Sequence, residues 1–202
     1  MIGDVASLGF TVNGIVPDGF RVMTMNKKVE SLADMHGLKM RMPNLEIMVE
    51  IGNYLGFAVT PMSMTEVFSA LEQGVIDGQE NPPSTIRSQG WYEIQDYLLV
   101  SNHVFTSLFL CVNNDFYNSL DSELQNILDE VIDETCAQIW DTAQTQAQED
   151  LDYMSSEGGI EVYEPSDSFR QEMVEATAPM YDNMYETAPE VEEVINAIQA
   201  IQ

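Results

Sequence analysis

Basic side chains are scarce in this sequence. It holds seven Lys and Arg residues against 34 Asp and Glu residues in a chain of 202, which gives a formal net charge of −27 at pH 7. Binding to nucleic acid is therefore excluded, because neutralising phosphates requires clustered Lys and Arg side chains. An anionic membrane surface is disfavoured for the same reason.

Residues for catalysis and metal binding are also few. Cys111 and Cys136 are too few for a disulfide framework and lack metal-ligand spacing, and the histidines are His36 and His103. The nucleophile-elbow, phosphate-loop, His-Glu-x-x-His, Cys-x-x-Cys and calcium-loop patterns are all missing. The sequence therefore predicts a protein that is not an enzyme and needs no metal or cofactor.

Long apolar runs are missing as well. The best one, residues 97–112, is interrupted by polar residues and falls short of the ~20 that a membrane-spanning helix needs. Residues 1–15 carry no Lys or Arg ahead of an apolar stretch and no small-residue cleavage pattern, so they do not read as a signal peptide. We therefore expect a chain that does not cross a bilayer.

The charges that are present are unevenly distributed. Residues 88–202 hold Arg170 as their single basic residue against 24 acids, which is typical of helices with solvated acidic faces. The first 87 residues hold the other six basic residues and ten acids. The basic residues that make this half the favourable place for an anion are Arg21, Lys27, Lys28, Lys39 and Arg41.

Short apolar runs alternate with helical periodicity between Gly19 and Gly78, as is typical of an α/β unit. Ser63 followed by Glu66 predicts a capping box at the start of a helix. Asn44 is predicted to cap another helix, the one that directly follows it in the sequence. Pro82 and Pro83 predict a helix start, reached through a loop over residues 78–81. Strands are predicted at residues 20–25, 38–42, 57–60, 75–77, 96–101 and 105–113.

Apolar residues recur every three or four positions from Asp121 to Ser156, with no Pro or Gly between them. This predicts one helix of about 54 Å, longer than the diameter of a 100-residue domain, so it must extend past a single lobe. A coiled coil is the alternative, but the spacing drifts from a heptad and no basic residues flank the acids. A strand at 160–163 and helices at 166–176, 181–186 and 189–201 are predicted to follow.

Four segments have an unusual local character: Gly19–Arg21, Gly37–Pro43, Thr60–Gly74 and Ile76–Pro82. In this order and spacing they resemble the solute-binding subunits of tripartite ATP-independent periplasmic (TRAP) transporters, of the DctP type. The motifs of that family run GLK-x-R-x-P, TPM…EV-x-x-AL-x-x-G and VDGQENP. The resemblance continues through the long helix to about the C-terminus.

The resemblance implies an α/β, periplasmic-binding-protein-like (type II) fold, in which two lobes close over an organic acid and a long helix runs along both. Members of the family usually extend further at the N-terminus, so the first lobe is expected to be incomplete. The expected ranges are 1–18 for a remnant of that lobe, 19–105 for the ligand-clamping lobe, 106–156 for a returning strand and the long helix, and 157–202 for a strand and C-terminal helices.

The resemblance also assigns ligand-binding residues. The family's equivalent of Arg41 clamps the ligand carboxylate, because a guanidinium offers a planar fork that lysine cannot copy. Arg21 is expected to be a second donor and Asn81 a hydrogen-bond partner. Met64 stands where relatives often have an aromatic wall, and His103 is expected near the pocket. Without the resemblance, such an arginine would be read as a surface ion-pair partner.

The expected function is that of a periplasmic or extracellular, membrane-associated receptor. It would capture a small organic acid (a C4-dicarboxylate, sugar acid or keto acid) and deliver it to the TRAP membrane permease, with no cofactor. The alternative is an incomplete receptor that serves as a protein-interaction or sensor-partner module, with a homodimer as one way to cover exposed apolar surface. A third hypothesis, an acidic hydrolase, rests only on the closeness of Asp77 and Glu80 in the sequence.

Overall fold

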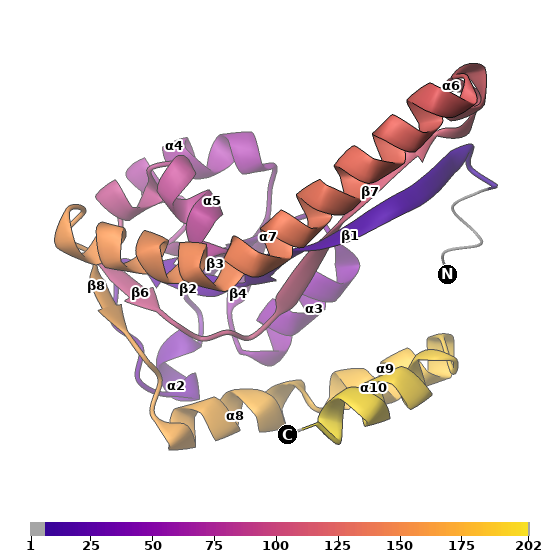
Figure 1. Ribbon diagram of the computed structural model, residues 1–202. Coiled ribbons are helices and arrows are strands. Elements are labelled where there is room, and N and C mark those ends of the chain that lie inside the picture. The colour runs from indigo at the N-terminus through magenta and orange to yellow at the C-terminus, as the bar shows by residue number, and fades with distance from the viewer. Residues whose placement is uncertain (1–6, 202) are drawn as a thin grey trace.

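The computed structural model describes residues 7–201, which form two sheets connected by one long helix (Figure 1). The smaller sheet is an antiparallel ribbon of β1 (Phe10–Phe20) and β7 (Phe105–Asn113). The larger sheet has the strand order β4-β3-β5-β2-β6-β8. Its strands are β2 (Val22–Met25), β3 (Lys39–Met42), β4 (Ala58–Pro61), β5 (Gly78–Asn81), β6 (Tyr97–Leu99) and β8 (Glu161–Tyr163).

Strand β2 runs antiparallel to both of its neighbours, β5 and β6, so the other five strands of the larger sheet share one direction. Helices cover both of its faces (Figure 1). On one face lie α2 (Leu32–Met35), α3 (Glu46–Tyr54) and α8 (Asp167–Thr177), and on the other lie α4 (Val67–Glu72), α5 (Pro83–Ser88) and the second half of α7 (Ser122–Ser156). The remaining elements are η1 (Met64–Glu66), η2 (Trp91–Glu93), α6 (Asn114–Ser119), α9 (Pro179–Thr187) and α10 (Val191–Gln199).

Methionines form much of the core on the α3 and α8 face. Met40 and Met42 of β3 are fully buried there, beside Met23 and Met25 of β2. Successive side chains of a strand point to opposite faces. The alternation therefore turns Arg41, which stands between two of these methionines, toward the opposite face of the sheet.

The long helix α7 confirms the prediction from periodicity. Asp121 caps it by accepting a hydrogen bond from the Leu124 backbone nitrogen. Its first half lies along the β1–β7 ribbon and its second half on the larger sheet (Figure 1), where Asp150 accepts a hydrogen bond from Arg87 at 2.7 Å. Among the residues that the structure describes, none of the helices is both long and apolar enough to cross a membrane.

Two predictions about element boundaries are wrong. The strand predicted at residues 75–77 begins later, because the segment predicted as a loop is strand β5, Gly78–Asn81. Helix α3 is preceded by Leu45 as its N-cap residue rather than by Asn44, and no side chain caps it. A tight turn, in which the Leu45 backbone nitrogen donates to the Pro43 carbonyl at 2.8 Å, delays the helix start by one residue.

The ribbon of β1 and β7 leaves large apolar side chains in solvent. Phe105 and Phe109 are 46% and 59% exposed, because within the described residues the ribbon has no covering element on that face. Phe20 packs edge-on against Phe105 at the base of the ribbon, with ring centroids 5.0 Å apart. The predicted division into ranges 1–18, 19–105, 106–156 and 157–202 stays a prediction, and residues 1–6 of the first range lie outside the described residues.

Candidate functional site

Three of the predicted ligand-binding residues gather at one edge of the larger sheet. Arg41 lies in β3 beside Gln79 of β5, and Asn81 is the last residue of β5. Because β2 runs in the opposite direction, Arg21, which directly precedes it, lies at the same edge. Open α/β sheets bind their ligands in the crevice outside the carboxyl ends of the parallel strands, and this is that edge.

The Arg41 side chain is buried without a counter-ion. The residue is 4% exposed, and its Nε and Nη2 donate to the Met62 carbonyl oxygen at 3.1 and 2.8 Å. In the described part of the chain, Arg41 has no carboxylate within ion-pair distance and its Nη1 has no hydrogen-bond partner. Burial lowers the pKa of Arg41, the Glu80 carboxylate opposes this, and the charge of Arg21 adds to it. A guanidinium stays protonated at neutral pH even so, and here it keeps donors available for an anion from outside.

Arg21 has the opposite situation, because a carboxylate already neutralises it. Its Nε and Nη2 donate to the two carboxylate oxygens of Glu80 at 2.5 and 2.9 Å. Nη2 also donates to the Glu80 carbonyl at 2.9 Å and to Asn81 Oδ1 at 3.1 Å. Arg21 therefore fixes the orientation of Asn81. Its predicted role as a second ligand donor stays a prediction, and Nη1 is the nitrogen left for that role among the described residues.

A chain of amide contacts orients Asn81. Its Nδ2 donates to Gln79 Oε1 at 2.8 Å, and Gln79 Nε2 donates in turn to Thr24 Oγ1 at 2.9 Å. An amide nitrogen carries two hydrogens, so one donor of Asn81 is left without a partner in the described part of the chain. Asn81 is thus held in one orientation with a donor to spare.

Glu80 is a site residue that the sequence prediction missed. It is fully buried, and His103 Nε2 lies 3.4 Å from Oε2, the oxygen that Arg21 Nε also contacts, without forming a hydrogen bond. The other ring nitrogen of His103 lies 2.8 Å from Ser101 Oγ. His103, which was predicted to lie near the pocket, thus lies next to Glu80 and Arg21. No local signal in the segment GQEN identified Glu80, because its burial, which makes the carboxylate need a cation, depends on residues distant in sequence.

The acid pair that motivated the hydrolase hypothesis does not act as a pair. Asp77 Oδ2 accepts a hydrogen bond from the Lys39 backbone nitrogen at 2.8 Å, whereas Glu80 accepts from Arg21. Each carboxylate thus has a structural partner of its own. Within the described residues, no group of three or more His, Cys, Asp or Glu side chains is placed to hold a metal ion.

The sequence matches the model of a known protein family along most of its length. The model of DctP, described as bacterial extracellular solute-binding protein, family 7, matches residues 2–188. The chain belongs to this family. The prediction that it is not an enzyme is confirmed by this membership, because the family is one of solute-binding proteins.

Curated DctP-type relatives are longer than this chain. An uncharacterized protein of Haemophilus influenzae is 35% identical over 181 residues, which are 90% of this chain and 55% of the relative. The C4-dicarboxylate-binding periplasmic protein DctP of Rhodobacter capsulatus is 29% identical over 186 residues, 92% of this chain and 56% of the relative. The chain therefore spans about half the length of the curated relatives it matches.

Solved structures of the family confirm the predicted fold class. A TRAP periplasmic solute-binding protein of Haemophilus influenzae with bound L-gulonate is 32% identical and superposes with a TM-score of 0.92, over 100% of this chain and 66% of the other. The sugar acid binding protein DctPAm of Advenella mimigardefordensis, in complex with galactonate, gives 27% identity and a TM-score of 0.91 over the same shares. The α/β, periplasmic-binding-protein-like architecture is thereby shown.

The predicted wall residue of this DctP-family chain lies at the surface. Met64 is 43% exposed in η1, directly after the segment whose Met62 carbonyl holds Arg41. The capping box predicted there is confirmed, since Ser63 and Glu66 bond reciprocally. The part that Met64 plays toward a ligand stays a prediction.

Lowering the pH should destabilise the fold by protonating Glu80. Burial raises the pKa of its carboxyl, but the neighbouring His103 and Arg21 lower it by more, so the pKa lies below its usual value. Such a group stabilises the fold above its unfolded-state pKa of about 4.3, and this contribution is lost as the pH falls through the folded-state pKa.

We therefore expect the free energy of unfolding, measured by urea denaturation between neutral and acidic pH, to fall less steeply in Glu80→Gln than in the unchanged chain. The matched control is Glu72→Gln, an exposed acid on α4, which should keep the original slope. Equal slopes for all three proteins would contradict the assignment.

Proposed function

We propose that this chain carries the ligand-clamping part of an extracytoplasmic solute-binding protein of a TRAP-type transporter, which captures a small organic acid. The observation that carries the proposal is Arg41, a buried guanidinium with no counter-ion in the described part of the chain. A carboxylate ligand would supply the missing charge and accept two parallel hydrogen bonds from Nη1 and Nη2. Asn81 would direct its remaining donor to the same ligand.

A sugar acid is the ligand class that we infer first. Two of the solved relatives hold L-gulonate and galactonate, and Arg41 and Asn81 suit the carboxylate end of such molecules. The hydroxyl groups of a sugar acid need hydrogen-bond partners when buried, and a second wall of the cleft would supply them. C4-dicarboxylates, bound by the Rhodobacter capsulatus relative, are the next class, and keto acids the third.

The proposed partner is the membrane permease of the same transport system, and the proposed location is the periplasm or the outer face of the membrane. Both follow from the family, whose members are bacterial extracellular solute-binding proteins. We propose further that the second wall of the cleft is formed by a segment equivalent to the part of the Haemophilus influenzae relative that this chain does not match.

The test is a thermal-shift screen of hexonates, hexuronates, C4-dicarboxylates and keto acids. The 202-residue chain would be compared with a chimera that adds the unmatched part of the gulonate-binding Haemophilus influenzae protein. We expect at least one acid to raise the melting temperature of the chimera by several degrees, since a ligand at 100 times its Kd adds about 2.7 kcal/mol. The matching neutral alditol should give no shift. No shift with any acid in either protein would remove the transport function.

The exposed ribbon supports a second candidate function. Phe20, Phe105 and Phe109 share one face of the ribbon and are each about half exposed, and single-domain proteins rarely leave such a patch uncovered. A protein-interaction module, including a homodimer, would bury this patch. Light scattering of the 202-residue chain at several concentrations separates the two candidates. A monomer that binds an acid supports the receptor, whereas a stable dimer that binds none supports the module.

A further inference from the structure

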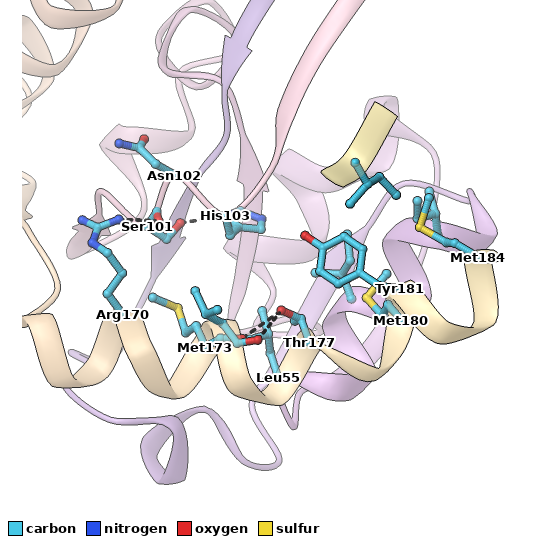
Figure 2. A pocket seen from close by; sticks show the side chains of 14 residues that line it. Leu55, Ser101, Asn102, His103, Arg170, Met173, Thr177, Met180, Tyr181 and Met184 are labelled. Carbon is cyan, nitrogen blue, oxygen red and sulfur yellow. Dashed lines mark hydrogen bonds between the residues drawn. The ribbon is translucent and has the colours of Figure 1, made fainter. Parts of the chain in front are cut away.

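A second concave site lies away from the Arg41 edge. A cavity of about 410 Å³ opens between α3, α8, α9 and the loop at residues 101–103 (Figure 2). Its volume is within the range of about 300–1,000 Å³ that is typical of small-molecule sites. Arg21, Arg41 and Asn81 are not among its lining residues. His103, which lies 3.4 Å from Glu80, is a lining residue shared with the Arg21–Glu80 cluster, so the cavity adjoins that cluster but does not include Arg41.

The lining of this cavity is apolar along most of its length and polar at one end. Leu55 directly after α3, Met173 of α8 and Met180 of α9 form apolar walls, and Tyr181 closes the far side (Figure 2). Ser101, Asn102, His103 and Arg170 lie together at the other end (Figure 2). An occupant must therefore be apolar over most of its length and polar at one end.

The polar end carries a positive charge that comes from the otherwise acidic second half of the chain. Arg170 is the single Lys or Arg among residues 88–202. Its Nη1 donates to the Ser101 carbonyl and its Nη2 to Glu164, both at 3.3 Å, which is long for a charged hydrogen bond. The Glu164 side chain is 66% exposed, so this ion pair is weak and can be exchanged for another carboxylate.

We propose that this cavity binds a carboxylate with an unbranched apolar tail, with the carboxylate at Arg170 and the tail between α3, α8 and α9. The tail would bury apolar surface against the methionines, whose flexible side chains adapt to such an occupant. A sugar acid suits this lining poorly, because most of its hydroxyl groups would lie against apolar side chains such as Leu55 and Met173, and Thr177 and Tyr181 would partner only a few of them. The proposal goes beyond the transport function and does not depend on it.

The test is calorimetric titration of the 202-residue chain with decanoate below its micellar concentration, beside two probes of equal tail length, decanol and decyltrimethylammonium. We expect decanoate to bind with a stoichiometry of one and about fivefold more tightly than decanol, which is what a half-exposed ion pair contributes. Decyltrimethylammonium should bind most weakly. Equal affinities for all three probes, or binding without a defined stoichiometry, would overturn the proposal.

Two variants locate the site. Arg170→Gln should weaken decanoate about fivefold and leave decanol unchanged, whereas the charge-matched Lys27→Gln at a 59% exposed side chain should change neither. Val174 lines the cavity and is 57% exposed, so Val174→Glu should fold normally and weaken decanoate tenfold or more. An effect of Lys27→Gln as large as that of Arg170→Gln would overturn the assignment. L-Gulonate added to the same titration should not compete with decanoate, because the two ligands are expected at different sites. A failure of the decanoate proposal can therefore be distinguished from a failure of the proposed transport function.

Discussion

Replacing Arg41 with Ala should remove most of the affinity for an organic acid. The ligand carboxylate would be buried without its partner, which costs on the order of 2–5 kcal/mol, or roughly thirtyfold to several thousandfold in Kd. Arg41→Lys should recover only part of this loss, because a lysine cannot donate to both carboxylate oxygens in one plane. The measurement is calorimetric titration of the chimera with the acid that gives the largest thermal shift.

The control for this prediction lies in the same strand. Lys39→Ala removes one positive charge at the exposed start of β3, away from the carboxyl edge, and should leave the Kd unchanged. If it weakens binding as much as Arg41→Ala does, the affinity depends on net charge rather than on the clamp. The charge of −27 does not by itself prevent binding, because the Debye length is about 8 Å at physiological salt and screens distant acids.

Loss of affinity at Arg41 should come without loss of stability. In the absence of ligand its charge is desolvated and lies in the field of Arg21, and both effects lower its pKa. Such a charge opposes folding, so Arg41→Met should leave the melting temperature of the ligand-free chain unchanged or raise it. This is the trade-off expected of a binding residue that is held ready for its ligand. A lower melting temperature in Arg41→Met would indicate a structural role instead.

Local sequence patterns predicted the framework of the fold, meaning its helices, caps and most strands, because the interactions that form these elements are local. The periodicity of α7, its cap at Asp121 and the capping box at Ser63 depend on residues within a few positions of one another. The strand predicted at residues 38–42 likewise agrees with β3, Lys39–Met42. These elements were predicted correctly.

The strand that carries the site could not be predicted in the same way. Gly78, Gln79, Glu80 and Asn81 are all buried, although their composition is typical of a loop. They tolerate burial because partners distant in sequence satisfy them: Thr24 bonds Gln79, and Arg21 bonds both Glu80 and Asn81. Only the family resemblance identified Asn81, and nothing local distinguished Glu80 from a solvated acid. The site is thus a tertiary property, whereas the framework is largely a local one.

Removing Glu80 should therefore destabilise the fold more than any surface change. Glu80→Ala leaves the Arg21 guanidinium buried without its anion, and breaking one half of a buried ion pair costs about 3–5 kcal/mol. Urea denaturation at neutral pH measures this loss. The double variant Arg21→Met, Glu80→Leu should recover much of it, because an apolar pair of similar volume needs no counter-charge. The apolar side chains of the double variant cannot hydrogen-bond the Asn81 amide. The double variant should therefore still bind the acid more weakly than the unchanged chain. Equal losses in the single and double variants would contradict the assignment of the loss to an unpaired Arg21 charge.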